Sequence, residues 1–114
     1  MKWVPFCGSY EPSAGARFAQ SFLEKRREIT AIVMGNDALA LGFMRVMRQR
    51  GARIPEDISV AGFDDVPEGA LVWPGLTTVA QPMREMGKAA CRTLFESIAA
   101  PIDLQTIEFS KDRS

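Results

Sequence analysis

Residues 29–63 have the sequence ITAIVMGNDALALGFMRVMRQRGARIPEDISVAGF, and this stretch decides the fold. It opens with a short apolar run rich in β-branched residues, Ile29–Met34, and closes with a second such run, Ile58–Phe63. Short, nearly continuous apolar runs predict strands that are covered on both faces, as in a parallel sheet. We therefore expect two strands of a parallel sheet at these positions.

Between the two predicted strands, residues 38–50 have the periodicity of an amphipathic helix. Asn36 or Asp37 can cap its start, and Gly51 stops it. The predicted buried stripe of this helix consists of Leu39, Phe43, Val46 and Met47. A strand, helix, strand succession of about 30 residues is typical of a right-handed βαβ unit. The predicted fold class is therefore α/β with a parallel sheet.

Further elements are expected on both sides of this unit. They are a helix from Ser13, its cap, to about Arg27, a short strand at Leu76–Val79, a helix from Pro82 to about Ala99, and marginal strands at Val4–Cys7 and Thr106–Phe109. The helix after Pro82 carries an apolar stripe that contains Met83, Met86, Ala90, Leu94 and Ile98. We expect this stripe to pack on the sheet of the same chain or on a second chain.

The length, charge and amino-acid composition of the sequence exclude several classes of function. The 114 residues contain 14 basic and 14 acidic side chains, so no basic face for nucleic acid or an acidic membrane is expected. Histidine is absent, which removes most nucleophilic and zinc-dependent catalysis. No apolar run could span a membrane, and no signal peptide or phosphate-binding glycine loop is recognisable. We expect a cytoplasmic binding protein without a cofactor, and reduced cysteines.

Polar side chains gather where two of the predicted strands end. Asn36 and Asp37 follow the first strand, and Asp64 and Asp65 follow the second. Ligands of parallel α/β sheets bind beyond the carboxyl ends of the strands. Tyr10 can reach the same edge from the loop before the first helix. Each residue also has a structural interpretation: the first pair can cap the helix, the second can form a turn, and Tyr10 can be a surface aromatic.

Four segments resemble the LacI/GalR family of bacterial transcription regulators, in the order and spacing of that family. They are residues 8–15 (GSYEPSAG), 30–42 (TAIVMGNDALALG), 55–65 (PEDISVAGFDD) and 76–87 (LTTVAQPMREMG). The resemblance covers nearly the whole chain. It implies half of a type-1 periplasmic-binding-protein fold, in which two Rossmann-like subdomains enclose a small molecule.

The resemblance also implies what residues 1–114 do. They correspond to part of an effector-binding and dimerisation domain, mostly its C-terminal subdomain, and the DNA-binding helix-turn-helix lies outside this chain. The resemblance implies that the effector is a sugar or a nucleoside-like molecule. Tyr10 matches the aromatic residue that stacks on the ligand, Asn36 a polar residue that hydrogen-bonds it, and Asp64 the carboxylate that grips it. The resemblance implies that DNA is contacted only through a domain outside residues 1–114.

The family resemblance extends to a dimer surface, formed by the helix at residues 38–48 and by residues 71–73. It implies a homodimer, although the apolar face of the helix can instead belong to the core. Two other functions remain open: a periplasmic-type sugar-binding protein and a truncated dimerisation module that modulates a full-length repressor. A carboxylate-dependent enzyme is disfavoured, because the neighbouring side chains of Asp64 and Asp65 point to opposite sides of an extended chain.

Overall fold

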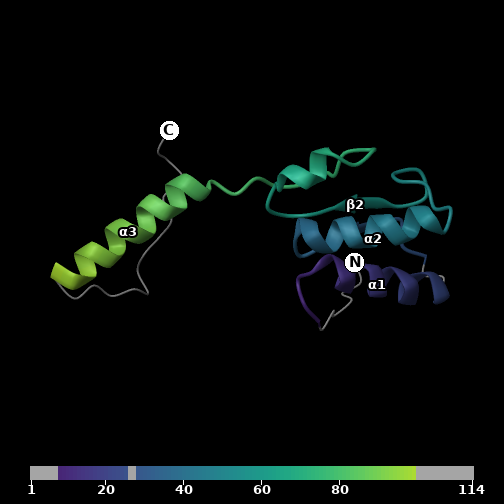
Figure 1. Cartoon of the computed structure of the whole chain (residues 1–114), viewed down its shortest axis with the longest axis horizontal. Helices are drawn as coiled ribbons and strands as arrows, with labels where there is room; N and C mark the ends of the chain where they lie inside the picture. Colours follow the sequence, from purple (N-terminus) through teal and green to yellow (C-terminus); the bar gives the residue numbers. More distant parts are fainter. Residues whose placement is uncertain (1–7, 26–27, 100–114) are drawn as a thin grey trace. The chain divides into compact units, whose positions relative to one another are not determined.

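The computed structural model describes residues 8–25 and 28–99 (Figure 1). The chain divides into two compact units after Gln81, and each is described by itself. The marginal strands predicted at Val4–Cys7 and Thr106–Phe109 lie outside the described residues. Within the described ranges, no helix is both long and apolar enough to cross a membrane.

The first unit contains the predicted βαβ succession. Strand β1 (Ala31–Val33) is followed by helix α2 (Asp37–Gln49) and by strand β2 (Ser59–Ala61). The two strands are parallel, with Ile32 opposite Val60. The α/β class is confirmed, although both strands are shorter than the apolar runs that predicted them. The parallel pairing brings the carboxyl ends of β1 and β2 to the same edge of the sheet.

The third predicted strand, residues 76–79, is reduced to two isolated bridges. Thr77 pairs in parallel with Ala61, and Ala80 pairs in parallel with Asp64. This segment therefore runs alongside β2 and continues past its end. It carries the following residue, Gln81, to the same edge of the sheet.

Helix α1 (Pro12–Glu24) begins one residue before its predicted cap. Glu11 occupies the N-cap position and makes no side-chain cap hydrogen bond. The prediction that Ser13 caps this helix is wrong, because Pro12 has a backbone already suited to the first helical position and starts the helix there. The helix ends with Lys25 as its C-cap, so the predicted end at Arg27 lies beyond the observed one.

Helices α1 and α2 cross at two glycines. A Cβ atom on Gly15 would lie 2.0 Å from the carbonyl oxygen of Leu39, and one on Gly42 would lie 1.9 Å from the carbonyl oxygen of Pro12. Both obstacles are main-chain atoms, so neither can rotate away. The two helices therefore approach backbone to backbone, which requires a residue without a side chain at each position.

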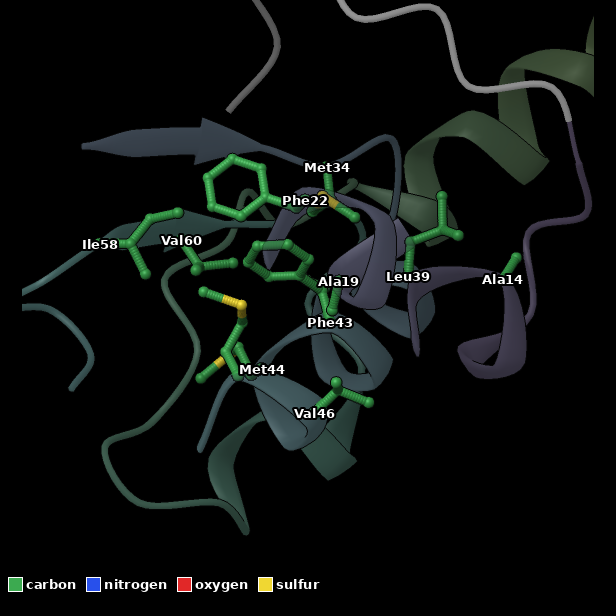
Figure 2. Close-up of a cluster of buried hydrophobic side chains, with 12 residues drawn as sticks. Ala14, Ala19, Phe22, Met34, Leu39, Phe43, Met44, Val46, Ile58 and Val60 are labelled. Carbon is green, nitrogen blue, oxygen red and sulfur yellow. The ribbon is translucent and has the colours of Figure 1, made fainter. Parts of the chain in front are cut away.

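Aromatic rings fill the space between the two helices and the sheet (Figure 2). The ring centroid of Phe43 lies 5.8 Å from that of Phe18 and 5.7 Å from that of Phe22. Ile58 and Val60 are buried in the same cluster. The buried stripe predicted on α2 is confirmed. Full burial of a side chain of this kind contributes about 1.5–3 kcal/mol relative to exposure.

The sheet is covered on one face within the first unit. Ile32 and Val60 pack against the core, whereas Val33 is 80% exposed and Ala31 and Ser59 are also exposed. The prediction that both faces of these strands are covered is wrong for the described residues. Side chains alternate along a strand, and both α1 and α2 pack with the residues of one face.

The second unit contains helix α3 (Met83–Ala99), which the sequence predicted. Pro82 precedes the helix, and its carbonyl accepts a hydrogen bond from the Met86 amide at 2.9 Å. No described residue of α3 is buried. The predicted stripe is present but exposed, with Leu94 59% and Ile98 74% exposed. The expectation that this stripe packs on the sheet of the same chain or on a second chain stays a prediction.

Candidate functional site

Tyr10 lies beside the carboxyl end of β1. A Cβ atom on Gly35 would lie 3.7 Å from Cε1 of the Tyr10 ring, so the ring stands next to this glycine. The main-chain carbonyl oxygen of Tyr10 accepts a hydrogen bond from Nδ2 of Asn36 at 3.2 Å. The side chain is 72% exposed. Tyr10 therefore presents an open aromatic face at the edge where ligands of parallel sheets bind.

Asn36 is the N-cap of helix α2. Its Oδ1 accepts a hydrogen bond from the Leu39 amide at 2.9 Å, while Nδ2 donates to Tyr10. The structural interpretation of Asn36 as a cap is confirmed, and Asp37 is the first helical residue. A primary amide has two donors and two acceptor positions. The two hydrogen bonds leave Asn36 one N–H and one lone pair for a further partner.

Asp64 follows β2 in an unusual backbone conformation. Its φ angle is 125°, and that of Asp65 is 62°, so both residues occupy positive φ. One oxygen of the Asp64 carboxylate, Oδ1, accepts a hydrogen bond from the side-chain amide of Gln81. The side chain is only partly buried. Asp64 is thus held by Gln81 and keeps Oδ2 for an outside donor.

The three predicted site residues come to one edge of the sheet. Tyr10 and Asn36 are joined directly by a hydrogen bond. Asp64 reaches the same edge from β2, and the Asp37 amide donates to the carbonyl of Phe63 at 2.9 Å, which ties the two strand ends together. The structure gives no direct side-chain bond between Asp64 and the other two. Their shared location is the one that the parallel topology predicts.

Two further residues, Gln81 and Thr78, belong to this edge and were not assigned to it from the sequence. Gln81 holds Asp64, and Asp37 and Thr78 form a hydrogen bond of 2.6 Å behind it. Asp37 was predicted at this edge, where it could cap the helix or contact a ligand, whereas Gln81 and Thr78 stood only in a family segment. The available signal was positional, because the end of a third parallel strand meets the same edge as the first two.

The acidic side chains of this edge do not gather into a metal site within the described part of the chain. Within residues 8–25 and 28–99, no three histidine, cysteine or acidic side chains are grouped so that they could hold a metal ion. The ion pair Arg53–Asp57 precedes β2, away from the carboxyl edge. Hydrogen bonds from Arg53 hold the pKa of Asp57 below its ordinary value.

Comparisons with known proteins agree with this architecture. The family of the periplasmic binding protein-like domain matches residues 2–110. The transcriptional regulator MalR of Streptomyces coelicolor is 51% identical over 72 residues, which cover 63% of this chain and 21% of that protein. The transcriptional repressor PurR of Erwinia tasmaniensis is 37% identical over 102 residues, which cover 89% of this chain and 30% of that protein.

Solved structures give the same result. A putative LacI-family regulator from Sanguibacter keddieii has a TM-score of 0.77 and 36% identity, covering 84% of this chain and 35% of that one. A LacI-family regulator from Enterococcus faecium, solved with bound ribose, has a TM-score of 0.72 and 30% identity, with 84% and 35% covered. The fold is that of a periplasmic-binding-protein-like domain. Within that class, the chain belongs to the LacI/GalR family of transcriptional regulators, in the effector-binding region.

Proposed function

We propose that this chain is the sensing part of a LacI-type regulator and binds a small effector, a sugar or a nucleoside-like molecule, at the carboxyl edge of the sheet. The observation that carries the proposal is the gathering of Tyr10, Asn36 and Asp64 at that edge, each with unused binding capacity. A polyol requires donors and acceptors on one side and a flat apolar surface on the other. These three side chains supply both.

Each residue has a distinct role in the proposal. The free Oδ2 of Asp64 accepts a hydroxyl hydrogen, and a hydrogen bond to a charged acceptor is stronger than one between neutral groups. The second N–H of Asn36 donates to a hydroxyl or ring oxygen. The exposed ring of Tyr10 stacks on the apolar face of the ligand. The ribose bound to the similar regulator from Enterococcus faecium supports this class of ligand.

The regulatory part of the proposal concerns the whole protein. The chain spans between about a fifth and a third of the regulators it matches, 21% of MalR and 30% of PurR. We propose that effector binding here controls DNA binding by a helix-turn-helix outside residues 1–114, in the cytoplasm. Because the matching relatives are named as transcriptional regulators, a regulator is favoured over a periplasmic-type sugar-binding protein and over an enzyme.

Isothermal titration with D-ribose, lactose and adenosine tests the effector site, both on this chain and on a longer protein that contains it. The variant Asp64→Asn is expected to weaken binding by roughly 10-fold or more, since it removes a charged hydrogen-bond acceptor. Asp65→Asn is the matched control, because it makes the same change on an exposed side chain that has no side-chain hydrogen bond among the described residues. Equal affinities of the two variants would contradict the assignment of Asp64.

Homodimer formation is a second part of the proposal. A groove of about 630 Å³ lies against the outer side of α2, and Leu41, Met44, Arg45 and Leu71 are among its lining residues. Leu71, which lines this groove, is 83% exposed, and Trp73, two residues further along the chain, is 89% exposed. Exposed apolar side chains next to an apolar groove suit a two-fold contact, in which each copy supplies both. The same surface favours a second candidate function, a dimerisation module that pairs with a longer relative.

A further inference from the structure

Asp37 is a buried carboxylate that the proposed effector site does not use. It is fully buried at the start of α2, and both of its oxygens accept hydrogen bonds. Oδ1 accepts from the hydroxyl of Thr78 at 2.6 Å, and Oδ2 accepts from the amide of Val66 at 2.9 Å. Among the described residues, no ion pair involves Asp37. A buried carboxylate requires such partners, and here it obtains them from two distant segments of the chain.

The hydrogen bonds around Asp37 enclose the turn that contains Asp64. On one side of the turn, the Asp37 amide donates to the carbonyl of Phe63 at 2.9 Å. On the other side, the carboxylate of Asp37 accepts from Val66, as described above. The hydroxyl of Thr78 accepts in turn from the amide of Asp65 at 3.2 Å. The Asp37–Thr78 pair therefore holds the main chain both before and after Asp64.

The turn requires such support. Asp64 and Asp65 both have positive φ, a region that side chains with a Cβ atom disfavour. Residues persist in this conformation when the surrounding structure determines it. Gly62 provides the space for this arrangement, because a Cβ atom there would lie 2.2 Å from Oδ1 of Asp37. Buried Asp37, its partner Thr78 and the strained turn thus fit each other closely.

We propose that Asp37 and Thr78 are positioning residues, which hold the Asp64–Asp65 turn and thereby aim the carboxylate of Asp64 at the effector. This inference rests on the proposed function for its purpose, but its structural part can be tested without any ligand. Neither side chain touches the ligand in this scheme. Each acts through the main chain of the turn.

The test compares Thr78→Val with Thr78→Ser in the 114-residue chain by nuclear magnetic resonance. Three-bond HN–Hα couplings of Asp64 and Asp65 report their φ angles, and amide exchange of Asp65 and Val66 reports their hydrogen bonds. Thr78→Val is expected to change the couplings and to speed exchange at these amides by about 10-fold or more. Thr78→Ser keeps the hydroxyl and should restore both measurements. A general loss of stability would not change the couplings of the folded state.

Two further variants complete the test. Thr77→Val makes the same change on an adjacent exposed side chain without a side-chain hydrogen bond among the described residues, and it should leave the turn unchanged. Asp37→Asn replaces one of the two acceptors and should disturb the same amides, which keeps the test valid if Thr78→Val does not fold. Wild-type couplings and exchange in whichever of Thr78→Val and Asp37→Asn folds would overturn the proposal.

Titration with D-ribose then separates the two proposals. If the wild-type chain binds D-ribose, Thr78→Val should weaken binding in the same direction as Asp64→Asn, and Thr78→Ser should recover it. If wild-type affinity persists in Thr78→Val although its turn has changed, the positioning role is overturned while the effector site stands. If the wild-type chain does not bind D-ribose, the proposed function fails for this sugar, and the couplings still decide whether the pair holds the turn.

Discussion

At position 36, a single amide serves both helix α2 and the loop before helix α1. Oδ1 caps the helix, and Nδ2 holds the carbonyl of Tyr10. A helix cap satisfies a main-chain N–H that has no partner inside the helix. The same side chain therefore stabilises the scaffold and builds the edge at which we propose the effector binds. A substitution at this position changes stability and binding together.

The cap gives a prediction for a single residue. Asn36→Ala is expected to lower the free energy of unfolding by about 0.5–2 kcal/mol, the usual effect of losing an N-cap side chain. Urea denaturation followed by circular dichroism measures the change. Asn36→Asp keeps the acceptor and loses the donor to Tyr10, so it should retain most of the stability. Wild-type stability in Asn36→Ala would show that the cap contributes little here.

At the scale of elements, the crossing of α1 and α2 depends on Gly15 and Gly42. Alanine is a better helix former than glycine by about 1 kcal/mol, so local propensity alone favours replacing both. The close main-chain contacts at the crossing oppose this gain. The main-chain atoms that an added methyl group would meet belong to the opposite helix, so the two helices must separate to admit it. Tertiary packing therefore outweighs local propensity at these two positions.

Gly42→Ala is accordingly expected to destabilise the first unit by about 1–3 kcal/mol, the usual effect of overpacking. Gly87→Ala on α3 is the matched control, because a Cβ atom there would meet nothing within 4 Å. It should leave the first unit unchanged and raise the helicity of α3. Urea denaturation and far-ultraviolet circular dichroism measure both effects. Equal stability of Gly42→Ala and the wild type would contradict the backbone contact.

The hydrophobic periodicity and the helix stop signals of the sequence could predict the helices and strands. They could not predict which segments cover each face of these elements. Helix α2 has its predicted cap region, buried stripe and end, and Gly51 follows its C-cap with a φ angle of 85°. The start of α1 was missed because Pro12 and Ser13 are adjacent start signals and the sequence does not rank them. The open face at Val33 was missed because an apolar run does not reveal which segments will cover it.

The candidate site was predicted in part for a similar reason. Asn36 and Asp64 follow strands, so the rule for parallel sheets locates both at one edge. The partners of Asp37 and Asp64 could not be found in this way. Thr78 lies 41 residues from Asp37, and Gln81 lies 17 residues from Asp64. Such pairs depend on register between distant segments, which periodicity does not report.

For the whole molecule, the proposed dimer gives a prediction about assembly. If the groove on α2 and the neighbouring residues 71–73 form the contact, Leu71→Asp should convert dimers into monomers. The reason is that a charge would be buried without a partner at the centre of an apolar interface. Size-exclusion chromatography with light scattering measures the mass. Leu94→Asp on α3 is the control, since it places the same charge on another exposed apolar side chain.

The two variants distinguish the possible interfaces. A dimer that survives Leu71→Asp but dissociates in Leu94→Asp would assign the contact to the exposed stripe of α3 instead. A wild-type chain that is monomeric at all concentrations tested would remove the homodimer from the proposed function. It would leave the effector site unaffected, because Asp64 and Gln81 form their hydrogen bond within one chain.

The link between Tyr10 and Asn36 has a consequence for how such a sensor can diversify. The atom of Tyr10 that accepts the hydrogen bond is its main-chain oxygen, which every amino acid possesses. The ring at position 10 can therefore be exchanged without detaching the loop from α2. Under the proposed function, natural variation or a mutant library at position 10 would change the ligand preference, while the hydrogen bond between this loop and α2 would stay in place. Evolution can thus modify selectivity here separately from foldedness.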